Sequence, residues 1–114
     1  QLESIAVNLK NGINSLSTAA DWLLANYDSK PQAAAAGAVP FLKMTGIVVG
    51  GWLMARSAAI AVKHMAAGTT DDFYQAKLAT ATYFAAHQLP FAAAYAAEIT
   101  GGSESVFALP ENLF

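Results

Sequence analysis

Two alanine-rich apolar segments with helical spacing constrain the fold of this chain more than any other feature. One is GIVVGGWLMAR, from Gly46 to Arg56, and the other is FYQAKLATATYFAAHQ, from Phe73 to Gln88. Neither segment contains a set of residues suited to catalysis. No part of the chain alternates apolar and polar residues with a period of two over a useful length. The sequence therefore predicts an all-α protein whose helices serve mainly to pack.

The first predicted helix, from Leu2 to Tyr27, presents one narrow apolar face. Its apolar and small residues recur at alternating spacings of three and four, which is the heptad pattern of a packed helix. Polar residues fall mostly on the other face, which we expect to meet water. The residues of the apolar face are Leu2, Ile5, Leu9, Gly12, Leu16, Ala19 and Leu23.

The second predicted helix, from Ser29 to about Ala67, is expected to be the most buried. Ser29 to Gln32 fits a capping box, in which the serine hydroxyl accepts from the backbone N–H of Gln32. Gly37 and Pro40 predict a break or kink, because Pro40 removes a backbone donor and crowds the preceding turn. After Pro40, apolar residues cover most of the circumference. One apolar face holds Phe41, Met44, Val48, Trp52, Ala55, Ala59 and Val62, and another holds Leu42, Val49, Leu53 and Ile60.

A third helix is predicted to start after Gly68. Thr69 and Thr70 can cap it, and Asp71 and Asp72 lie where the positive end of the helix dipole favours carboxylates. These four polar residues follow directly on an apolar run, so they mark a turn between two helices.

The third helix completes an up-and-down helical bundle. It runs to about Gln88, is kinked by Pro90, continues from Phe91 to Thr100 and stops at Gly101–Gly102. The predicted fold class is all-α, with three long helices, two of them kinked by proline, or four helices, over residues 1–102. Residues 103–114 form a C-terminal tail that is expected to dock on the bundle through Phe107, Leu109, Leu113 and Phe114.

The composition predicts either an unusually full core or an apolar surface that meets a partner. Hydrophobic residues make up 55% of the 114 residues and charged residues 12%, whereas average proteins carry roughly 25% charged residues. An unusually apolar surface is typically covered by another protein surface. The net charge of −2 and the lack of a basic block argue against a nucleic-acid ligand.

Cysteine content, the first residue and the apolar run lengths favour a cytoplasmic domain of a larger protein. The chain has no cysteine, which rules out disulfide bonds and thiolate metal sites within it. It starts at Gln1 without a signal-peptide pattern, which is consistent with an excised domain or a processed terminus. The apolar run from Val39 to Val62 contains Lys43 and Arg56, with twelve residues between them. A spanning helix needs about 20 apolar residues, so we expect no membrane span.

Small residues in the second helix indicate close packing. Gly46 and Gly50 form a GxxxG pattern, which lets a neighbouring backbone or aromatic ring approach the helix. Each glycine lowers intrinsic helix stability by about 1 kcal/mol relative to alanine. We therefore expect a large side chain, from Trp22, Tyr83 or Phe84, to pack there and offset that loss.

Arg56 and Lys77 lie within apolar stretches and allow two interpretations. Their charged ends can reach the surface beyond apolar stems. Alternatively, one can pair with an acid across the bundle, for instance Arg56 with Glu98 or Asp21. The sequence pattern does not choose between them.

No residue is predicted to be catalytic, cofactor-binding or metal-binding. His64 and His87 are the two histidines, and neither has a second ligand three or four residues away on its helix face. They are interpreted as surface or boundary residues. Asp71 and Asp72 are adjacent and therefore point apart on a helix, so capping is their expected role. Glu98 stands alone on the third helix.

Three segments carry a family resemblance: PFLKMTGIVVGGWLMARSA from Pro40 to Ala58, FYQAKLATATYFAAHQLP from Phe73 to Pro90, and ITGGSESVFALPENLF from Ile99 to Phe114. In this order they resemble the helical domain at the C-terminus of a subgroup of bacterial acyl-CoA dehydrogenases. That subgroup includes enzymes resembling 3-methylmercaptopropionyl-CoA dehydrogenase. The likeness covers most of the chain and is weaker over the first helix.

The resemblance implies a non-catalytic C-terminal domain of a flavoenzyme. Such an enzyme takes a proton and a hydride from adjacent carbons of an acyl-CoA thioester and passes the hydride to FAD. In that family the flavin site, the thioester site and the catalytic glutamate belong to the preceding core, so Glu98 and Glu104 receive no catalytic role. The implied partners are that core and a second subunit, contacted through apolar helix faces, and a homo-oligomer is expected.

Two other interpretations remain open. The chain can be an independent signalling bundle, such as a histidine phosphotransfer module in which His64 or His87 accepts phosphate. Lys63 beside His64, with Gly68 four residues on, is weak support for it. The chain can also be an oligomerisation or adaptor bundle without a dehydrogenase parent.

Overall fold

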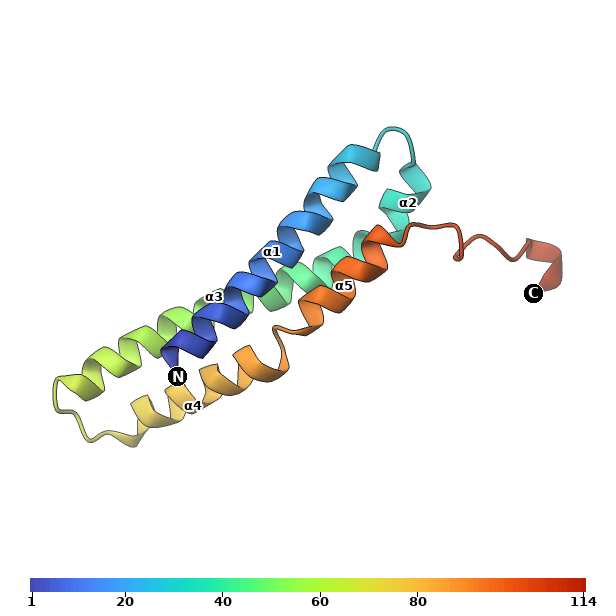
Figure 1. The fold of residues 1–114 in the computed structure, drawn as a ribbon. Helices are drawn as coiled ribbons and strands as arrows, with labels where there is room; N and C mark the ends of the chain where they lie inside the picture. Colours follow the sequence, from blue (N-terminus) through green and yellow to red (C-terminus); the bar gives the residue numbers. More distant parts are fainter.

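The computed structural model describes all 114 residues, and its regular elements are all helices. In Figure 1, α1 and α3 run side by side, while α4 and α5 follow one another along the third side of the bundle. The molecule is elongated, with extents of 66 × 29 × 16 Å including the tail. The expected up-and-down bundle is thus confirmed. Its elements are α1 (Leu2–Asn26), α2 (Pro31–Ala36), α3 (Ala38–Ala66), α4 (Asp72–His87), α5 (Phe91–Thr100) and the 3₁₀ turn η1 (Glu111–Leu113).

The predicted break in the second helix lies at Gly37, which separates α2 from α3. A Cβ atom at Gly37 would lie 3.2 Å from Leu23 Cδ2 of α1 and 3.3 Å from Ile99 Cγ2 of α5. Close packing of three elements therefore explains a residue without a side chain here. Pro40 lies in the first turn of α3, where its missing N–H leaves no helical acceptor unpaired.

The expected cap of α2 is wrong, whereas the capping role expected of Asp71 is confirmed. The capping residue of α2 is Lys30 rather than Ser29, because Pro31, with its fixed φ, occupies the first helical position. No side chain caps α2. At α4 the cap is Asp71 rather than a threonine, since its Oδ1 accepts from the backbone N–H of Phe73 at 2.9 Å. Thr69 Oγ1 instead accepts from the backbone N–H of Asp71 at 3.4 Å.

The core is divided into two clusters along the length of the bundle. The first lies between the C-terminal half of α1, the N-terminal half of α3, and α5, with Met44 fully buried. The second lies between the other halves of α1 and α3, together with α4, and is built around Leu89. Alanine provides about half of the buried side chains, so the helices approach closely. The buried residues of the two clusters are Ala19, Met44, Val48, Ala92, Ala96 and Ile99, and Ile5, Ala58, Ala81, Ala85 and Leu89.

The side chain of Leu89 fills the space beside Gly12 and Gly51. It lies at the break between α4 and α5. A Cβ atom would come within 3.2 Å of Leu89 Cδ2 at Gly12, and within 2.6 Å of the same atom at Gly51. Both glycines are buried, so their missing side chains admit the leucine. The break between α4 and α5 therefore places Leu89 in the core as well as bending the chain.

The expected close packing at the GxxxG pattern is confirmed at one glycine and wrong at the other. A Cβ atom at Gly50 would lie 3.2 Å from Cζ of Phe84, one of the three residues expected to pack there. At Gly46 it would meet no atom within 4 Å. The two residues are four apart, but Gly46 faces outward because no helix lies on that side of α3.

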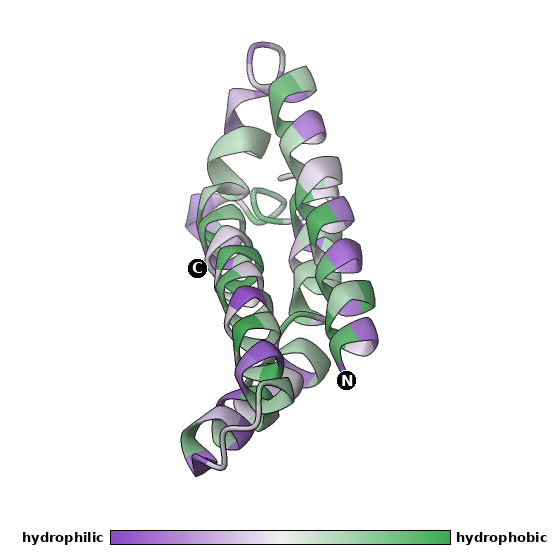
Figure 2. Ribbon diagram, turned by 90° about the vertical axis from the view of Figure 1, so that its left-hand side faces the viewer, coloured by the Kyte–Doolittle hydropathy of each residue, from purple (hydrophilic) through white to green (hydrophobic).

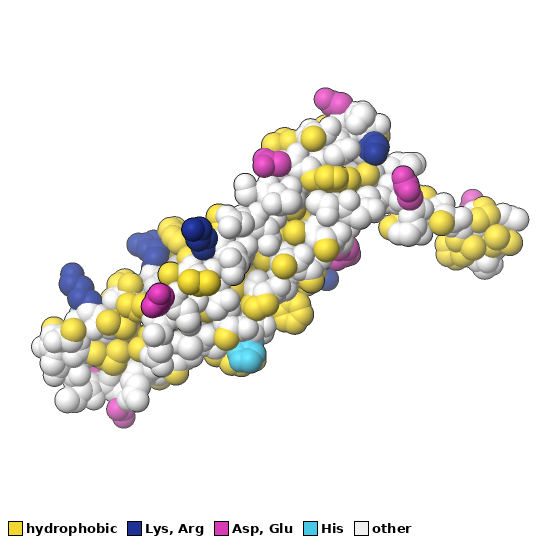
Figure 3. All heavy atoms as spheres, viewed as in Figure 1, with side chains coloured by type: hydrophobic (Ala, Val, Ile, Leu, Met, Phe, Trp, Pro, Cys, Tyr) yellow, Lys and Arg dark blue, Asp and Glu magenta, His cyan; other side chains and the backbone are white.

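Residues 105–114 leave the bundle, whereas Ser103 and Glu104 still line hollows beside α2. Gly102 has a φ of +76°, a conformation that suits glycine, and the chain then runs away from the helices (Figure 1). Hydrophobic side chains gather at the far end of this tail in Figure 3. In the single chain these side chains are exposed, and docking of the tail on the bundle stays a prediction. Its exposed apolar residues are Val106, Phe107, Leu109, Leu113 and Phe114.

Candidate docking surfaces

The two histidines lie on the surface, as expected, and each stacks on a tyrosine of α4. The ring centroids of His64 and Tyr74 are 4.6 Å apart, and those of His87 and Tyr83 are 4.7 Å apart. The first pair joins the end of α3 to α4, whereas the second lies within α4 at a spacing of four residues. Both pairs therefore support local helix packing.

Arg56 and Lys77 follow the first of their two predicted interpretations. The guanidinium carbon of Arg56 lies 5.1 Å from the centre of the Trp52 ring, and Nζ of Lys77 lies 5.5 Å from that of Phe73. Each cation thus covers an aromatic ring four residues earlier on its own helix. Arg56 is exposed and turned away from the bundle interior.

The carboxylates do not converge. Asp71 caps α4, Asp72 lies in its first turn, and Glu98 is exposed on α5. No group of three or more histidine, cysteine, aspartate or glutamate side chains could hold a metal ion. Every polar side-chain atom that is buried has a hydrogen-bond partner. No strained or orphaned polar group therefore marks a catalytic centre.

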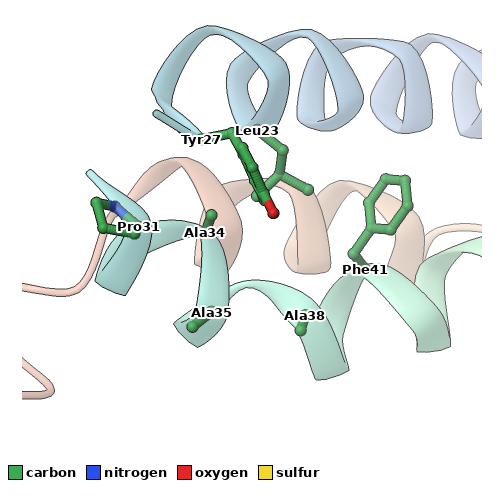
Figure 4. A pocket seen from close by; sticks show the side chains of 7 residues that line it. All are labelled: Leu23, Tyr27, Pro31, Ala34, Ala35, Ala38 and Phe41. Carbon is green, nitrogen blue, oxygen red and sulfur yellow. The ribbon is translucent and has the colours of Figure 1, made fainter. Parts of the chain in front are cut away.

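The largest hollow lies between the end of α1, α2 and the start of α3 (Figure 4). Its volume is about 530 Å³. Tyr27 is its one residue with a polar side-chain group. A flavin dinucleotide needs donors for its pyrophosphate and for the ring edge, so these residues do not fit that cofactor. The lining residues are Leu23, Tyr27, Pro31, Ala34, Ala35, Ala38 and Phe41.

The clearest candidate for a docking surface is the outer side of α3. Its apolar residues are between 44% and 72% exposed. They recur at spacings of three, four and seven over more than five helical turns, so they form one straight stripe. Gly46 lies within this stripe and leaves a hollow in it. We call it the outer stripe of α3, and it consists of Val39, Leu42, Gly46, Val49, Leu53 and Ile60.

Hydrophobic residues are consequently not confined to the surfaces between helices. Figure 2 shows green stretches along every long helix, alternating with purple and white ones. By length and composition alone, α3 is apolar enough to cross a membrane, and 22% of its most apolar window is buried in the single chain. Exposed Lys43 and Arg56 divide that helix, and its inner face packs on three neighbours. A single helix of this kind is weak evidence for a membrane span, because core helices share its composition.

The charges on α3 all have one sign. Lys43, Arg56 and Lys63 are exposed on the helix, which has no aspartate or glutamate. The tail has the opposite sign, with Glu104 and Glu111 and no lysine or arginine over residues 103–114. Sequence reasoning missed this complementarity. The sequence did contain a signal for it on the second predicted helix. There Lys43 follows Leu42 directly, and Arg56 lies three residues after Leu53.

Comparison with known proteins identifies the family. The family described as "Acetyl-CoA dehydrogenase C-terminal like" matches residues 1–110. A 3-methylmercaptopropionyl-CoA dehydrogenase of Ruegeria pomeroyi is 36% identical over 104 residues, which is 91% of this chain and 18% of that protein. The broad-specificity linear acyl-CoA dehydrogenase FadE5 of Mycobacterium tuberculosis is 46% identical over 57 residues, 47% of this chain and 9% of that protein.

These matches confirm the resemblance carried by the three sequence segments. The chain spans less than a fifth of the length of the curated relatives it matches. The matched residues 1–110 include helices α1 to α5 and most of the tail. The chain belongs to the family of acetyl-CoA dehydrogenase C-terminal-like domains.

Proposed function

We propose that this chain is the non-catalytic C-terminal domain of an FAD-dependent acyl-CoA dehydrogenase of the cytoplasm. Its work is structural, because it packs on the preceding catalytic core and helps to join subunits of a homo-oligomer. The observation that carries this proposal is the outer stripe of α3, an uncovered apolar surface along the longest helix.

The energetics of the stripe support a covered state in the full protein. Burial of one large apolar side chain stabilises a structure by about 1.5–3 kcal/mol. The stripe holds five such side chains, all substantially exposed in the single chain. Monomeric proteins rarely expose a continuous apolar patch of this kind. Contact with a core or a second subunit accounts for it.

The dehydrogenase chemistry belongs elsewhere in this proposal. FAD, held by the preceding core, would accept the hydride from the acyl-CoA thioester. The residues of the present chain contribute neither a flavin pocket nor a converging acid–base pair. They hold the core and the subunits in place.

The histidine phosphotransfer interpretation has less support. Its two candidate residues each stack on a tyrosine, and no aspartate or glutamate adjoins them in sequence. The family match over residues 1–110 favours the dehydrogenase domain instead. Acid-labile phosphate on His64 or His87 after incubation with a phosphodonor would revive the alternative.

A comparison of the full-length protein with a version that stops before Gln1 tests the proposal. We expect the full-length protein to bind FAD and to reduce it on addition of an acyl-CoA. The shortened protein should keep some flavin reduction in a single turnover but form smaller oligomers and unfold at a lower temperature. Flavin absorbance, light scattering and thermal unfolding report these three properties.

A single substitution provides the matched comparison if the shortened protein does not fold. Leu53→Asp places a charge on the outer stripe, whereas Ser17→Asp places one on an exposed position of α1. We expect only the first to weaken assembly of the full-length protein. Loss of flavin reduction with assembly intact would contradict a purely structural role, and a full-length protein that binds no flavin would contradict the dehydrogenase assignment.

A further inference from the structure

The tail and the outer stripe of α3 have matching patterns of charge and apolar residues. In the tail, Glu104 and Glu111 flank the apolar stretch from Val106 to Leu109. On α3, Lys43 and Arg56 flank the middle of the outer stripe. The tail has no cation and α3 has no acid, so each surface supplies the charge that the other lacks.

The spacings of the two patterns also agree. Lys43 and Arg56 are 13 residues apart, which is about 20 Å along a helix that rises 1.5 Å per residue. Glu104 and Glu111 are seven residues apart, which is up to about 23 Å in an extended chain. In the single chain residues 103–107 form a turn, in which the backbone N–H of Phe107 donates to the carbonyl of Ser103 at 3.2 Å. Once docking opens that turn, the extended tail can place both glutamates beside cations while its apolar residues lie on the stripe between them.

The stripe offers a place for a large side chain of the tail. Gly46 carries no side chain, and nothing lies within 4 Å of the position that a Cβ atom would take. Leu42 and Val49 stand on either side of this hollow, one helical turn away. Phe107 lies midway between the two glutamates and is 57% exposed, so it is the tail residue suited to that hollow.

The tail of the same chain is poorly placed to reach this surface. The turn at Gly102 directs residues 103–114 away from the bundle (Figure 1). The outer stripe lies on the side of α3 that no helix of its own chain covers. A second copy can cover the stripe with its tail and can receive the tail of the first copy, because its own tail also extends outward and its own stripe is also uncovered.

We infer that residues 103–114 of one copy dock on the outer stripe of α3 of a second copy, with Glu104 and Glu111 beside Lys43 and Arg56. This inference rests on the proposed function and deepens it, because it names the partner that covers one of the apolar surfaces. Reciprocal exchange between two copies would close a symmetric dimer. The exposed tail and the exposed stripe then have one common explanation.

Photo-crosslinking in the full-length protein tests the contact. A donor copy carries p-benzoylphenylalanine in place of Phe107, and a co-expressed acceptor copy with a different tag lacks residues 103–114. Because the acceptor has no tail, a product that carries both tags joins two copies. Trypsin cuts after Lys43 and Arg56, so the expected crosslinked peptide runs from Met44 to Arg56 of the acceptor.

Each other result overturns the inference. Crosslinks confined to the donor's own chain would mean that the tail folds back, and crosslinks to other peptides would mean a different receptor. Absence of crosslinks would mean that the tail stays free. If dimers persist on light scattering without a crosslink to residues 44–56, the exchange fails while the structural role proposed above stands.

Charge reversal gives an independent readout. We expect the double variant Glu104→Lys, Glu111→Lys to weaken dimerisation about tenfold at low salt, and the added changes Lys43→Glu, Arg56→Glu to restore it. The matched control is Lys10→Glu, which reverses an exposed cation on α1 and should leave dimerisation unchanged. Failure of the second pair of changes to restore association, or equal weakening by the control, would contradict the proposed pairing.

Discussion

The two faces of α3 carry similar residues in different surroundings. On the inner face, Met44 and Ala58 are fully buried between α1 and the α4–α5 side of the bundle. On the outer face, Leu42 is 72% exposed although it lies only two residues from Met44. The apolar residues thus surround the helix, whereas the rest of this chain covers one side of it.

This difference teaches that apolar periodicity alone does not locate the core of a domain that joins a larger assembly. The inner face mixes Met44 and Val48 with small residues such as Gly51 and Ala58, which allow helices to approach closely, whereas leucine, valine and isoleucine dominate the outer stripe. Small residues thus occur where helices of this chain approach one another, whereas the large residues of the outer stripe have no neighbouring helix in the chain. Matched substitutions on the inner and outer faces of α3 test this difference.

The largest expected effect comes from a charge on the inner face. Met44→Asp removes a fully buried apolar side chain and places an unpaired carboxylate in the core. We expect a loss of more than about 4 kcal/mol in the free energy of unfolding, enough to unfold the isolated chain. Urea denaturation followed by circular dichroism measures it.

Leu42→Asp is the matched variant on the outer face. It should change the free energy of unfolding of the dilute isolated chain by no more than about 0.5 kcal/mol, because the side chain is largely exposed. Met44→Leu, which nearly conserves volume, should cost less than about 1.5 kcal/mol and controls for the position itself. Equal losses from the two aspartate variants would mean that the outer face is also buried in the single chain.

The next largest loss of stability is expected from substitutions at Leu89 and at Gly51, which it contacts. Leu89→Ala empties the space beside Gly51 and should lower the free energy of unfolding by about 2–5 kcal/mol. Gly51→Ala alone forces a Cβ atom against Leu89, so we expect a smaller loss, of about 1–2 kcal/mol. In the Leu89→Ala background the same change should instead recover stability.

A double-mutant cycle measures this coupling. We expect an interaction free energy of about 2–3 kcal/mol between the two sites, because Gly51→Ala costs stability in one background and adds up to about 1 kcal/mol in the other. Additive losses would show that Leu89 and Gly51 do not share a space.

The helices were predictable from the sequence because their signals are local. The heptad spacing gave the first helix as Leu2 to Tyr27, and α1 ends one residue earlier. Breakers at Gly68 and Gly101–Gly102 bounded the rest, since a glycine just past the end of a helix readily adopts the positive φ that Gly68 and Gly102 have. The family resemblance depended on ordered side-chain types, which the comparisons matched over residues 1–110.

The docking surfaces were less predictable because they depend on what lies opposite each face. The sequence showed two apolar faces on α3 and could not tell which one the other helices would cover. It also pointed to Trp22, Tyr83 or Phe84 as packing partners and missed Leu89, which reaches Gly51 only because the chain breaks at Gln88–Pro90. The direction of the tail depends on the positive φ of Gly102, a torsion that no spacing rule supplies.

A smaller effect separates the two glycines of the GxxxG pattern. Gly46→Ala adds a methyl group in open space and should stabilise the isolated chain by about 1 kcal/mol, the difference in helix propensity. Gly50→Ala has the same propensity gain, but its methyl group would meet the Phe84 ring at 3.2 Å, so its net effect should be close to zero or unfavourable. Thermal unfolding of both variants at low concentration compares them directly. A stabilising Gly50→Ala and a destabilising Gly46→Ala would reverse the assignment of inner and outer positions.

The smallest effect is expected at Arg56, whose cation already contacts an aromatic ring of its own helix. Arg56→Gln removes the cation above Trp52 but keeps a long polar side chain of good helix propensity. An exposed cation–π contact is worth about 0.5–1 kcal/mol, so the loss in free energy of unfolding should be of that size. Trp52 fluorescence should shift as the guanidinium leaves its ring, and Lys63→Gln, which alters a cation on the same helix without a ring partner among the described contacts, is the matched control. A loss above about 2 kcal/mol from Arg56→Gln alone would mean that this side chain holds the bundle together, and the outer face of α3 would then be part of the fold rather than a surface kept for a partner.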